Sequence, residues 1–408
     1  MRIAILAVGN EVLSGEIVNT NGAFAAKEAE LRGAIISRQL VLPDDVEKIR
    51  EGLETAYRDA GVVIAIGGLG PTVDDLTRQG AAAYFGVELV LDEKILAGIE
   101  GFFSRVGRPM PPNNRQQALG FKTGTFLPNP NGTAPGLLLE KGGRTLFLLP
   151  GPPDELRPMV HTFVLPYIDR HMDTPLVTRS FRLYGIGESA AESRIIGLYE
   201  KYPQVNLAPY ASISCLDYVL TAPKTFTSQL EAFEKDFLQL LGEHVAGVRG
   251  VPLAKTVVER LKRHDKTLVA AESCTGGMLA SELINIPGVS PVFLEGVVSY
   301  SNLSKIRRLG VKEETLAAYG AVSAETACEM AQSLRQQWDC DYALSITGIA
   351  GPDGGTAEKP VGLCYIALAQ KGRSVIVERF VFPGNREKIR LRAATAALYL
   401  LFRQIKTL

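Results

Sequence analysis

The sequence predicts an α/β protein in which two parallel-sheet domains are joined by a small α+β unit. Short, wholly apolar runs such as residues 3–9 and 62–66 alternate with segments of helical periodicity. Continuous apolar strands separated by helices are typical of a parallel sheet that helices cover on both faces. Polar, glycine-rich loops follow several of these runs, and 408 residues are enough for two or three such domains.

The elements of the N-terminal domain, which we place at residues 1–168, follow in order along the chain. Asp44 is the expected N-cap of the second helix, because its side chain can accept a backbone N–H. The third strand is wholly apolar and stops at a glycine cluster. We predict strands at 2–8, 34–42 and 62–66, and helices at 21–31, at 44–57 and from about residue 75 onward.

Two linkers are expected, at residues 165–179 and 246–252, where Pro, Gly or charged residues gather. Residues 176–246 read as strand, helix, strand, strand and helix, which predicts a small α+β unit without a strong chemical motif. The C-terminal domain, at residues 252–408, begins with a helix in which Leu253, Val257 and Leu261 recur every four positions. Its strands are predicted at 267–271, 293–299, 342–346, 361–369 and 374–382, and its last helix at 385–405.

The composition excludes several classes of protein. The 44 basic and 44 acidic side chains cancel, and no basic stripe is evident, so direct nucleic-acid binding is not expected. The 4 His and 5 Cys show neither metal-ligand spacing nor a CxxC pair, which argues against a zinc site or a disulfide framework and favours a reducing cytoplasm. No uncharged stretch is long and apolar enough to span a bilayer.

The most specific motif of the N-terminal domain is the segment 67–77, GGLGPTVDDLT, directly after the third strand. Ligands of open α/β sheets bind beyond the carboxyl ends of strands, and glycines there let backbone N–H groups approach a phosphate. Asp74 and Asp75 would repel that phosphate unless a divalent cation such as Mg²⁺ lay between them. The alternative is a tight turn followed by an acidic first helical turn. The spacing matches neither GxGxxG nor a P-loop.

Two further loops are expected at the same edge, because each follows a predicted strand. The first contains the sequence GNE at 9–11 and NTN at 19–21, and the second is PGPPDE at 150–155. The segment NNRQ at 113–116 either contacts a sugar or phosphate or forms a capped surface helix. The candidate ligand-binding residues are Gly68, Gly70, Thr72, Asn19, Asn21 and Gly151.

These motifs resemble the molybdopterin-binding fold of molybdenum-cofactor biosynthesis proteins. The variant with NTN and PGPP resembles the N-terminal domain of the CinA family of competence/damage-inducible proteins. The resemblance implies catalytic roles for Asp75 and Glu11 in metal and phosphate chemistry, and we take Asp74 and Asp75 as the metal ligands. It implies a metal-dependent ADP-ribose pyrophosphatase that gives AMP and ribose 5-phosphate.

The C-terminal domain carries a second motif, ESCTGG at 272–277, between a predicted strand and a helix. A nucleophile on such a turn is exposed, and helix-terminal N–H groups can form an oxyanion hole. Both Ser273 and Cys274 qualify as that nucleophile, and a serine needs a base.

No His lies near a motif of this domain, so the candidate base is a lysine. The segment YSNLSK at 300–305 follows a strand and would bring Tyr300 and Lys305 to the same edge. A desolvated lysine loses its proton near neutral pH, although Lys305 could instead begin an exposed basic helix. The loop TGIAGPDGG at 347–355 suits an anion or a ribose. Arg386 or Arg390 could clamp a phosphate, unless both are solvated surface residues.

The segments ESCTGG, YSNLSK, TGIAGPDGG and GNREKIR together resemble the C-terminal domain of the CinA family, the nicotinamide-nucleotide amidases. The resemblance implies that Ser273 is the nucleophile, activated by Lys305 and Tyr300, with Cys274 as its rival. The implied reaction converts nicotinamide mononucleotide (NMN) and water into nicotinate mononucleotide and ammonia, without a cofactor. The implied substrate contacts are Arg390, Thr347, Gly348, Gly351, Gly276 and Gly277.

We therefore expect a bifunctional enzyme of pyridine-nucleotide recycling that is cytoplasmic and homodimeric, with a middle unit that resembles a KH-like domain. Its expected partners are NMN and ADP-ribose, with no membrane and no nucleic acid. The alternative is a nucleotide- or pterin-binding protein with a competence- or DNA-associated role and only one active domain.

Overall fold

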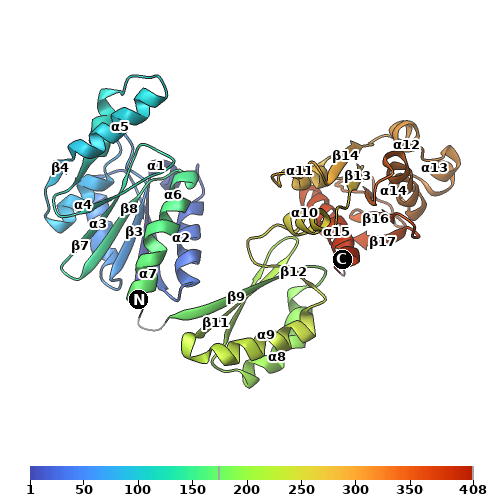
Figure 1. The fold of residues 1–408 in the computed structure, drawn as a ribbon, viewed down its shortest axis with the longest axis horizontal. Coiled ribbons are helices and arrows are strands. Elements are labelled where there is room, and N and C mark those ends of the chain that lie inside the picture. Colours follow the sequence, from blue (N-terminus) through green and yellow to red (C-terminus); the bar gives the residue numbers. More distant parts are fainter. Residues whose placement is uncertain (173–174, 407–408) are drawn as a thin grey trace. The chain divides into compact units, whose positions relative to one another are not determined.

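The computed structural model describes residues 1–172 and 175–406, which fall into two compact units. The first unit comprises residues 1–178 and 223–225, and the second comprises residues 179–222 and 226–408. No helix in the described part of the chain has the length and apolar character that a membrane span requires. Each unit is built on its own sheet or sheets (Figure 1).

The first unit contains a six-stranded sheet with the strand order β2-β1-β3-β8-β7-β6. The first four strands in this order are parallel, and β7 and β6 add antiparallel at one edge. The strands are β1 (Arg2–Val8), β2 (Ile35–Leu42), β3 (Val62–Ile66), β6 (Thr125–Leu127), β7 (Gly136–Lys141) and β8 (Arg144–Leu149). A separate hairpin pairs β4 (Leu89–Leu91) with β5 (Leu119–Phe121).

Helices cover both faces of this sheet, as the apolar strands predict. On one face α3 and α4 close an apolar cluster, and on the other α2, α6 and α7 close a second one (Figure 1). The helices are α1 (Asn10–Leu13), α2 (Thr20–Glu30), α3 (Val46–Ala56), α4 (Thr77–Phe85), α5 (Glu93–Arg105), α6 (Pro153–Met159) and α7 (Leu165–His171). A 3₁₀ helix spans Pro112–Ala118, and a π-helical turn at Val160–Val164 joins α6 to α7.

Two local predictions for this unit are wrong. Asp45, not Asp44, caps α3 by accepting the Lys48 N–H, and Asp44 instead accepts the Asn10 N–H at 2.9 Å. The linker predicted at residues 165–179 contains α7 and the start of β9 (Leu176–Leu183), apart from residues 173–174, which lie outside the described residues. Pro166 is compatible with α7 because it lies in the first helical turn, where no intrahelical N–H is needed.

The second unit begins with a small sheet of order β10-β11-β9-β12. Its strand, helix, strand, strand, helix order agrees with the prediction, and Phe237 of α9 packs against Phe181 of β9 and Tyr218 of β11. The elements are α8 (Glu188–Lys201), β10 (Asn206–Ala211), β11 (Leu216–Pro223), α9 (Thr227–Leu241) and β12 (Val245–Gly247). A 3₁₀ turn at Lys224–Phe226 connects β11 to α9 along the chain.

The rest of this unit is a five-stranded sheet of order β14-β13-β15-β16-β17. The strands are β13 (Leu268–Glu272), β14 (Phe293–Val298), β15 (Tyr342–Gly348), β16 (Leu363–Gln370) and β17 (Ile376–Val381). The helices are α10 (Leu253–Arg263), α11 (Met278–Ile284), α12 (Asn302–Leu309), α13 (Glu313–Tyr319), α14 (Ala324–Trp338) and α15 (Arg386–Ile405). All five strands and the last helix lie where the sequence predicts them, within about three residues at each end.

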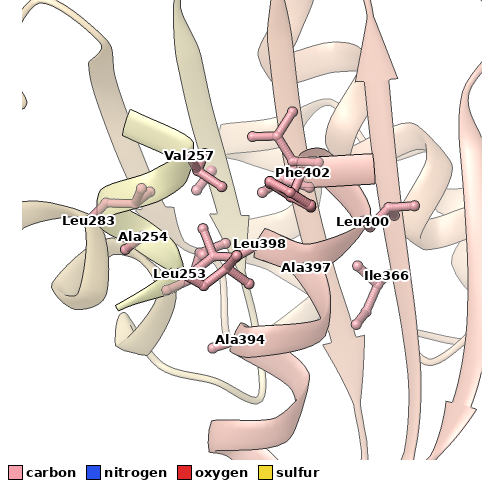
Figure 2. Close-up of a cluster of buried hydrophobic side chains, with 14 of the residues drawn as sticks. Leu253, Ala254, Val257, Leu283, Ile366, Ala394, Ala397, Leu398, Leu400 and Phe402 are labelled. Atoms are coloured by element: carbon pink, nitrogen blue, oxygen red, sulfur yellow. The ribbon is translucent and has the colours of Figure 1, made fainter. Parts of the chain in front are cut away.

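Apolar clusters hold this sheet from both faces. On one face Leu253 and Val257 of α10 pack against Leu398 and Phe402 of α15, in a cluster that includes Ile366 of β16 (Figure 2). On the other face the cluster is formed by α12 and α14. The parallel strands β14, β13 and β15 are neighbours, so the loops at their carboxyl ends meet at one edge.

Candidate functional sites

The loops that follow β13, β14 and β15 bring Ser273 and Lys305 into direct contact. Ser273 begins the turn after β13 and is 7% exposed, and Lys305 lies in the first turn of α12 and is 1% exposed. The distance from Lys305 Nζ to Ser273 Oγ is 2.9 Å. Lys305 is therefore not part of an exposed basic helix face, and a buried lysine touches the predicted nucleophile.

The surroundings of the Lys305 amine fix its orientation. Its Nζ donates to the Ser299 carbonyl at 2.7 Å and to the Tyr300 carbonyl at 3.2 Å. A neutral amine has two N–H groups and one lone pair, so these two carbonyls direct the lone pair toward Ser273 Oγ. Burial lowers the pKa of Lys305 to about 8, which makes the neutral form accessible near physiological pH.

Tyr300 and Cys274 lie differently from Lys305. The Tyr300 side chain is 65% exposed, and among the described contacts only its main-chain carbonyl reaches Lys305. The Cys274 thiol lies in the apolar cluster beside Cys364. A hydrogen bond from Cys364 lowers the pKa of Cys274, and the Lys305 charge acts in the same direction. Cys274 thus remains a chemical rival to Ser273.

Glu272 is a functional residue that the sequence reasoning passed over. Its buried carboxylate accepts the N–H groups of Gly277 at 3.0 Å, Leu279 at 3.1 Å and Ala280 at 2.8 Å. The first-turn donors of α11 are therefore occupied, and the helix terminus is not a free oxyanion hole. Within the described chain, the Thr275 N–H donates to no protein acceptor and the Cys274 N–H contacts only its own thiol, which leaves both for a developing oxyanion.

Replacing Glu272 with Gln should loosen this turn. The new amide group would place N–H donors against backbone N–H donors, so the free energy of unfolding of this unit should fall by about 2 kcal/mol. Urea unfolding followed by tryptophan fluorescence and circular dichroism measures the loss. Glu282, a half-buried residue of α11, offers a matched control. Equal losses in Glu272→Gln and Glu282→Gln would contradict the role of Glu272.

The predicted arginine and threonine contacts hold the loops of this site together. Arg390 donates to the Thr275 carbonyl through Nε at 3.3 Å and through its terminal nitrogen at 2.7 Å. Arg386 donates to the Gly351 carbonyl at 2.9 Å, and the Thr347 hydroxyl donates to the Ala321 carbonyl at 2.6 Å. The remaining guanidinium N–H groups of the two arginines are the donors that a phosphate could use.

Glycines at 276, 277, 348 and 351 shape the same loops. Gly276 and Gly277 have φ of 60° and 92°, in the left-handed region where a glycine carries no strain. At position 348 an added Cβ would lie 2.5 Å from the Cys364 sulfur. The Gly276 N–H donates to the Ser273 carbonyl at 3.1 Å, so this glycine turn lies directly against the predicted nucleophile.

The predicted N-terminal loops line one cavity of about 1010 Å³ in the first unit. It holds the carboxyl ends of β1 and β3 and the PGPPDE loop, as the strand order predicts. Among the described residues that line it there is no Lys, Arg or His. Its acidic lining residues are Glu11, Glu16, Asp44, Asp74, Asp75 and Glu155.

Asp75 holds the glycine loop, residues 67–77, in place through hydrogen bonds. One carboxylate oxygen accepts the Gly70 N–H at 2.7 Å, and the other accepts the Thr72 N–H at 2.7 Å and the Thr72 hydroxyl at 2.6 Å. Gly68 has φ of 65°, and a Cβ there would overlap the Thr77 hydroxyl, which donates to the Gly67 carbonyl at 2.8 Å. The N–H groups of Gly68 and Leu69, at the start of this loop, donate to no acceptor in the described chain, so they are free donors.

The remaining predicted residues tie neighbouring loops to this one. Asn19 caps α2 by accepting the Gly22 N–H at 2.8 Å, and Asn21 donates to the Gly151 carbonyl. Gln116, from the NNRQ segment, donates to the Gly70 carbonyl at 3.0 Å and the Thr72 carbonyl at 2.7 Å. Gln116 is thus a loop support, a role that neither interpretation of NNRQ included.

The carboxylates lie close enough to influence one another. Burial raises the pKa of Asp44, and the charges of Glu11, Asp75 and Asp74 add to that rise, while the Asn10 N–H opposes it. Across the described residues, however, no three His, Cys, Asp or Glu side chains converge into a metal cage. Mg²⁺ commonly binds through one or two carboxylates, with water and substrate phosphates completing its shell. Asp74 and Asp75 fit that kind of incomplete site.

Comparison with known proteins matches both parts of the chain. Residues 4–170 match the family described as "Probable molybdopterin binding domain", and residues 251–405 match the "CinA C-terminal domain". The competence/damage inducible protein CihA from Agrobacterium tumefaciens, a solved structure, is 38% identical, with a TM-score of 0.37, over 38% of this chain and 93% of that one.

Full-length relatives give the broader match. A CinA-like protein of Kosmotoga olearia is 40% identical over 402 residues, which cover 98% of this chain and 97% of that protein. A relative from Clostridium perfringens (strain SM101 / Type A), whose name refers to competence and damage induction, is 42% identical over 411 residues, which cover 100% of this chain and 99% of its own length. With this identity along its whole length, the chain belongs to the CinA family.

Proposed function

We propose that the C-terminal part of the chain is an amidase that converts NMN and water into nicotinate mononucleotide and ammonia. The observation that carries this proposal is the 2.9 Å contact between the buried Lys305 amine and Ser273 Oγ. A serine paired with a desolvated lysine is an activated nucleophile that needs neither histidine nor metal. Ammonia release from NMN by the purified full-length protein is the experiment that tests it.

The first half of the reaction forms an acyl-enzyme. Ser273 Oγ attacks the carboxamide carbon while its proton passes to the neutral Lys305 amine. The charge that develops on the carboxamide oxygen is stabilised by the N–H groups of Cys274 and Thr275. Lys305 then returns the proton to the departing nitrogen, the C–N bond breaks, and ammonia leaves behind an ester on Ser273.

The second half reverses these roles with water. Lys305, neutral again after ammonia leaves, takes a proton from water as the water oxygen attacks the ester carbonyl carbon. This attack forms a second tetrahedral intermediate with an oxyanion. The Ser273–acyl bond breaks and Lys305 returns the proton to Ser273 Oγ. The product is nicotinate mononucleotide, whose ribose and phosphate we assign to Arg390 and to the loop that contains Gly348 and Gly351.

The amidase rate should rise with pH through an apparent pKa of about 8, the value to which burial lowers Lys305. Below this pH the amine is protonated and cannot accept the Ser273 proton; above it the neutral base is present. The dependence of kcat/KM on pH, measured from about pH 6 to about pH 10, tests this expectation. Lys305→Arg, which stays protonated, should be inactive throughout, and a profile flat across pH 8 would contradict Lys305 as the base.

For the N-terminal cavity we propose hydrolysis of ADP-ribose to AMP and ribose 5-phosphate. Two observations support this second function: the glycine loop offers the free N–H groups of Gly68 and Leu69, and the lining carries six carboxylates without a basic side chain. A diphosphate can enter such a cavity only with cations that offset the repulsion. A bound divalent cation would supply that charge and polarise the phosphate, with Asp74 and Asp75 as its protein ligands.

The chain's own residues then bind and orient the diphosphate. Gly68 and Leu69 donate to phosphate oxygens, and Glu11, an exposed residue of the cavity lining, accepts a proton from the attacking water. AMP formation from ADP-ribose by the full-length protein, assayed beside ammonia release from NMN, tests the two functions independently.

A further inference from the structure

Arg78 is a buried cation that neither proposed reaction uses. It lies on α4, is 2% exposed and belongs to the largest fully buried side chains of the protein. Both terminal nitrogens donate to the Leu69 carbonyl at 3.2 Å, while Nε has no partner in the described structure. Burial lowers the pKa of Arg78 to about 10, and the nearby charge of Asp75 partly opposes that change.

Burying a guanidinium in this way is costly. No carboxylate of the described chain forms an ion pair with Arg78 within 4.0 Å, and a buried charge without a partner normally destabilises a fold. Apolar packing alone would be served better by a leucine or methionine at this position. The hydrogen bonds from Arg78 to the Leu69 carbonyl therefore need another explanation.

The Leu69–Gly70 peptide connects Arg78 to Asp75. Its carbonyl accepts from the guanidinium, and its N–H donates to Asp75 Oδ1 at 2.7 Å. In a trans peptide the C=O and N–H point in opposite directions, so this one unit lies between a positive and a negative group with its dipole aligned to both. Asp75 in turn holds Thr72 through its second oxygen.

We propose that Arg78 is a positioning residue of the N-terminal site, which acts on a phosphate ligand through the Leu69–Gly70 peptide and Asp75. Its hydrogen bonds to the Leu69 carbonyl fix the conformation of the loop, so that the free N–H groups of Gly68 and Leu69 keep a constant orientation. It is also a fixed positive charge beside a cavity whose charged lining residues are all acidic. This inference rests on the proposed phosphate ligand.

The loop can be tested without any ligand. Hydrogen exchange of peptides spanning residues 67–76, measured by mass spectrometry on the full-length protein, should be at least about tenfold faster in Arg78→Met. Arg78→Lys, which can still donate to the Leu69 carbonyl, should recover part of the protection. Ile49→Ala is the matched control, because Ile49 packs against Gly80 of α4, the helix that carries Arg78, but an isoleucine side chain donates no hydrogen bond to the loop. Equal exchange in Arg78→Met and wild type, or equal acceleration in Ile49→Ala, would overturn the proposal.

Binding of ADP with MgCl₂, measured by calorimetry, tests the route through Asp75. Arg78→Met and Asp75→Ala should each weaken binding by about tenfold or more, and the double variant should be little worse than either single one. Additive losses would show that Arg78 acts independently of Asp75 and would overturn the route. If the wild-type protein neither binds ADP nor cleaves ADP-ribose, the proposed function of this cavity fails, and the exchange experiment still decides the role of Arg78.

Discussion

Ser273→Ala should abolish ammonia release from NMN, with kcat reduced by about a thousandfold or more, because no other hydroxyl of the described residues forms a hydrogen bond with the Lys305 amine. Cys274→Ala should keep the rate within about tenfold of wild type, since this substitution removes a thiol that packs in the apolar cluster. The measurement is coupled-enzyme detection of ammonia at saturating NMN, with the free energy of unfolding of both variants determined in parallel.

The Cys274 thiol makes this pair of variants decisive. Its pKa is lowered by Cys364 and by Lys305, so it is chemically able to replace the serine as nucleophile. If Cys274→Ala is inactive while Ser273→Ala retains activity, the nucleophile is the thiol and the role of Lys305 changes from base to electrostatic support. Trapping the acyl group and locating it by mass spectrometry would give the same answer independently.

Asp75→Ala should remove ADP-ribose cleavage, with a loss of about a hundredfold or more, and leave the amidase unchanged. The alanine deletes the proposed cation ligand and also three hydrogen bonds that hold Gly70 and Thr72, and loop displacements of about 1 Å can cost a factor of this size. AMP formation and ammonia release are measured on the same preparation. EDTA should likewise stop only the first of these activities.

The response to added Mg²⁺ separates the two roles of Asp75. If Asp75 mainly binds the cation, high Mg²⁺ should restore part of the rate of Asp75→Ala, and if it mainly holds the loop, the rate should stay low at every concentration. A simultaneous loss of amidase activity in this variant would mean that the two sites do not act separately, and the bifunctional proposal would then be wrong.

Elements with a strong hydrophobic pattern were predictable from the sequence. β1 and β3 lie at the predicted residues because a buried parallel strand needs a continuous apolar run, and α15 lies where the last helix is predicted. The linker predicted at 165–179 failed because Pro and charged residues were taken as signs of a loop, whereas α7 accommodates Pro166 in its first turn.

The candidate sites were predictable at the level of which loops meet. The contact of Ser273 with Lys305 follows from adjacent parallel strands, whose carboxyl ends share an edge. Side chains that bind backbone groups were not predictable, because their partners depend on the path of the loop. The hydrogen bonds of Asp75 to its loop and of Glu272 to the first turn of α11 are of this kind. The burial of Arg78 was not predictable either, because nothing in the sequence distinguishes a buried arginine from an exposed one.

The two carbonyls that accept from the Lys305 amine have a consequence for sequence variation. The groups that orient its amine are carbonyls of the main chain, and a main-chain carbonyl survives any side-chain replacement at its own position. Position 299 should therefore accept other small residues that keep the backbone path, without loss of the geometry that orients the Lys305 amine. Mutational tolerance should be high there and very low at 273 and 305, and a deep mutational scan selected on deamidation would display that contrast directly.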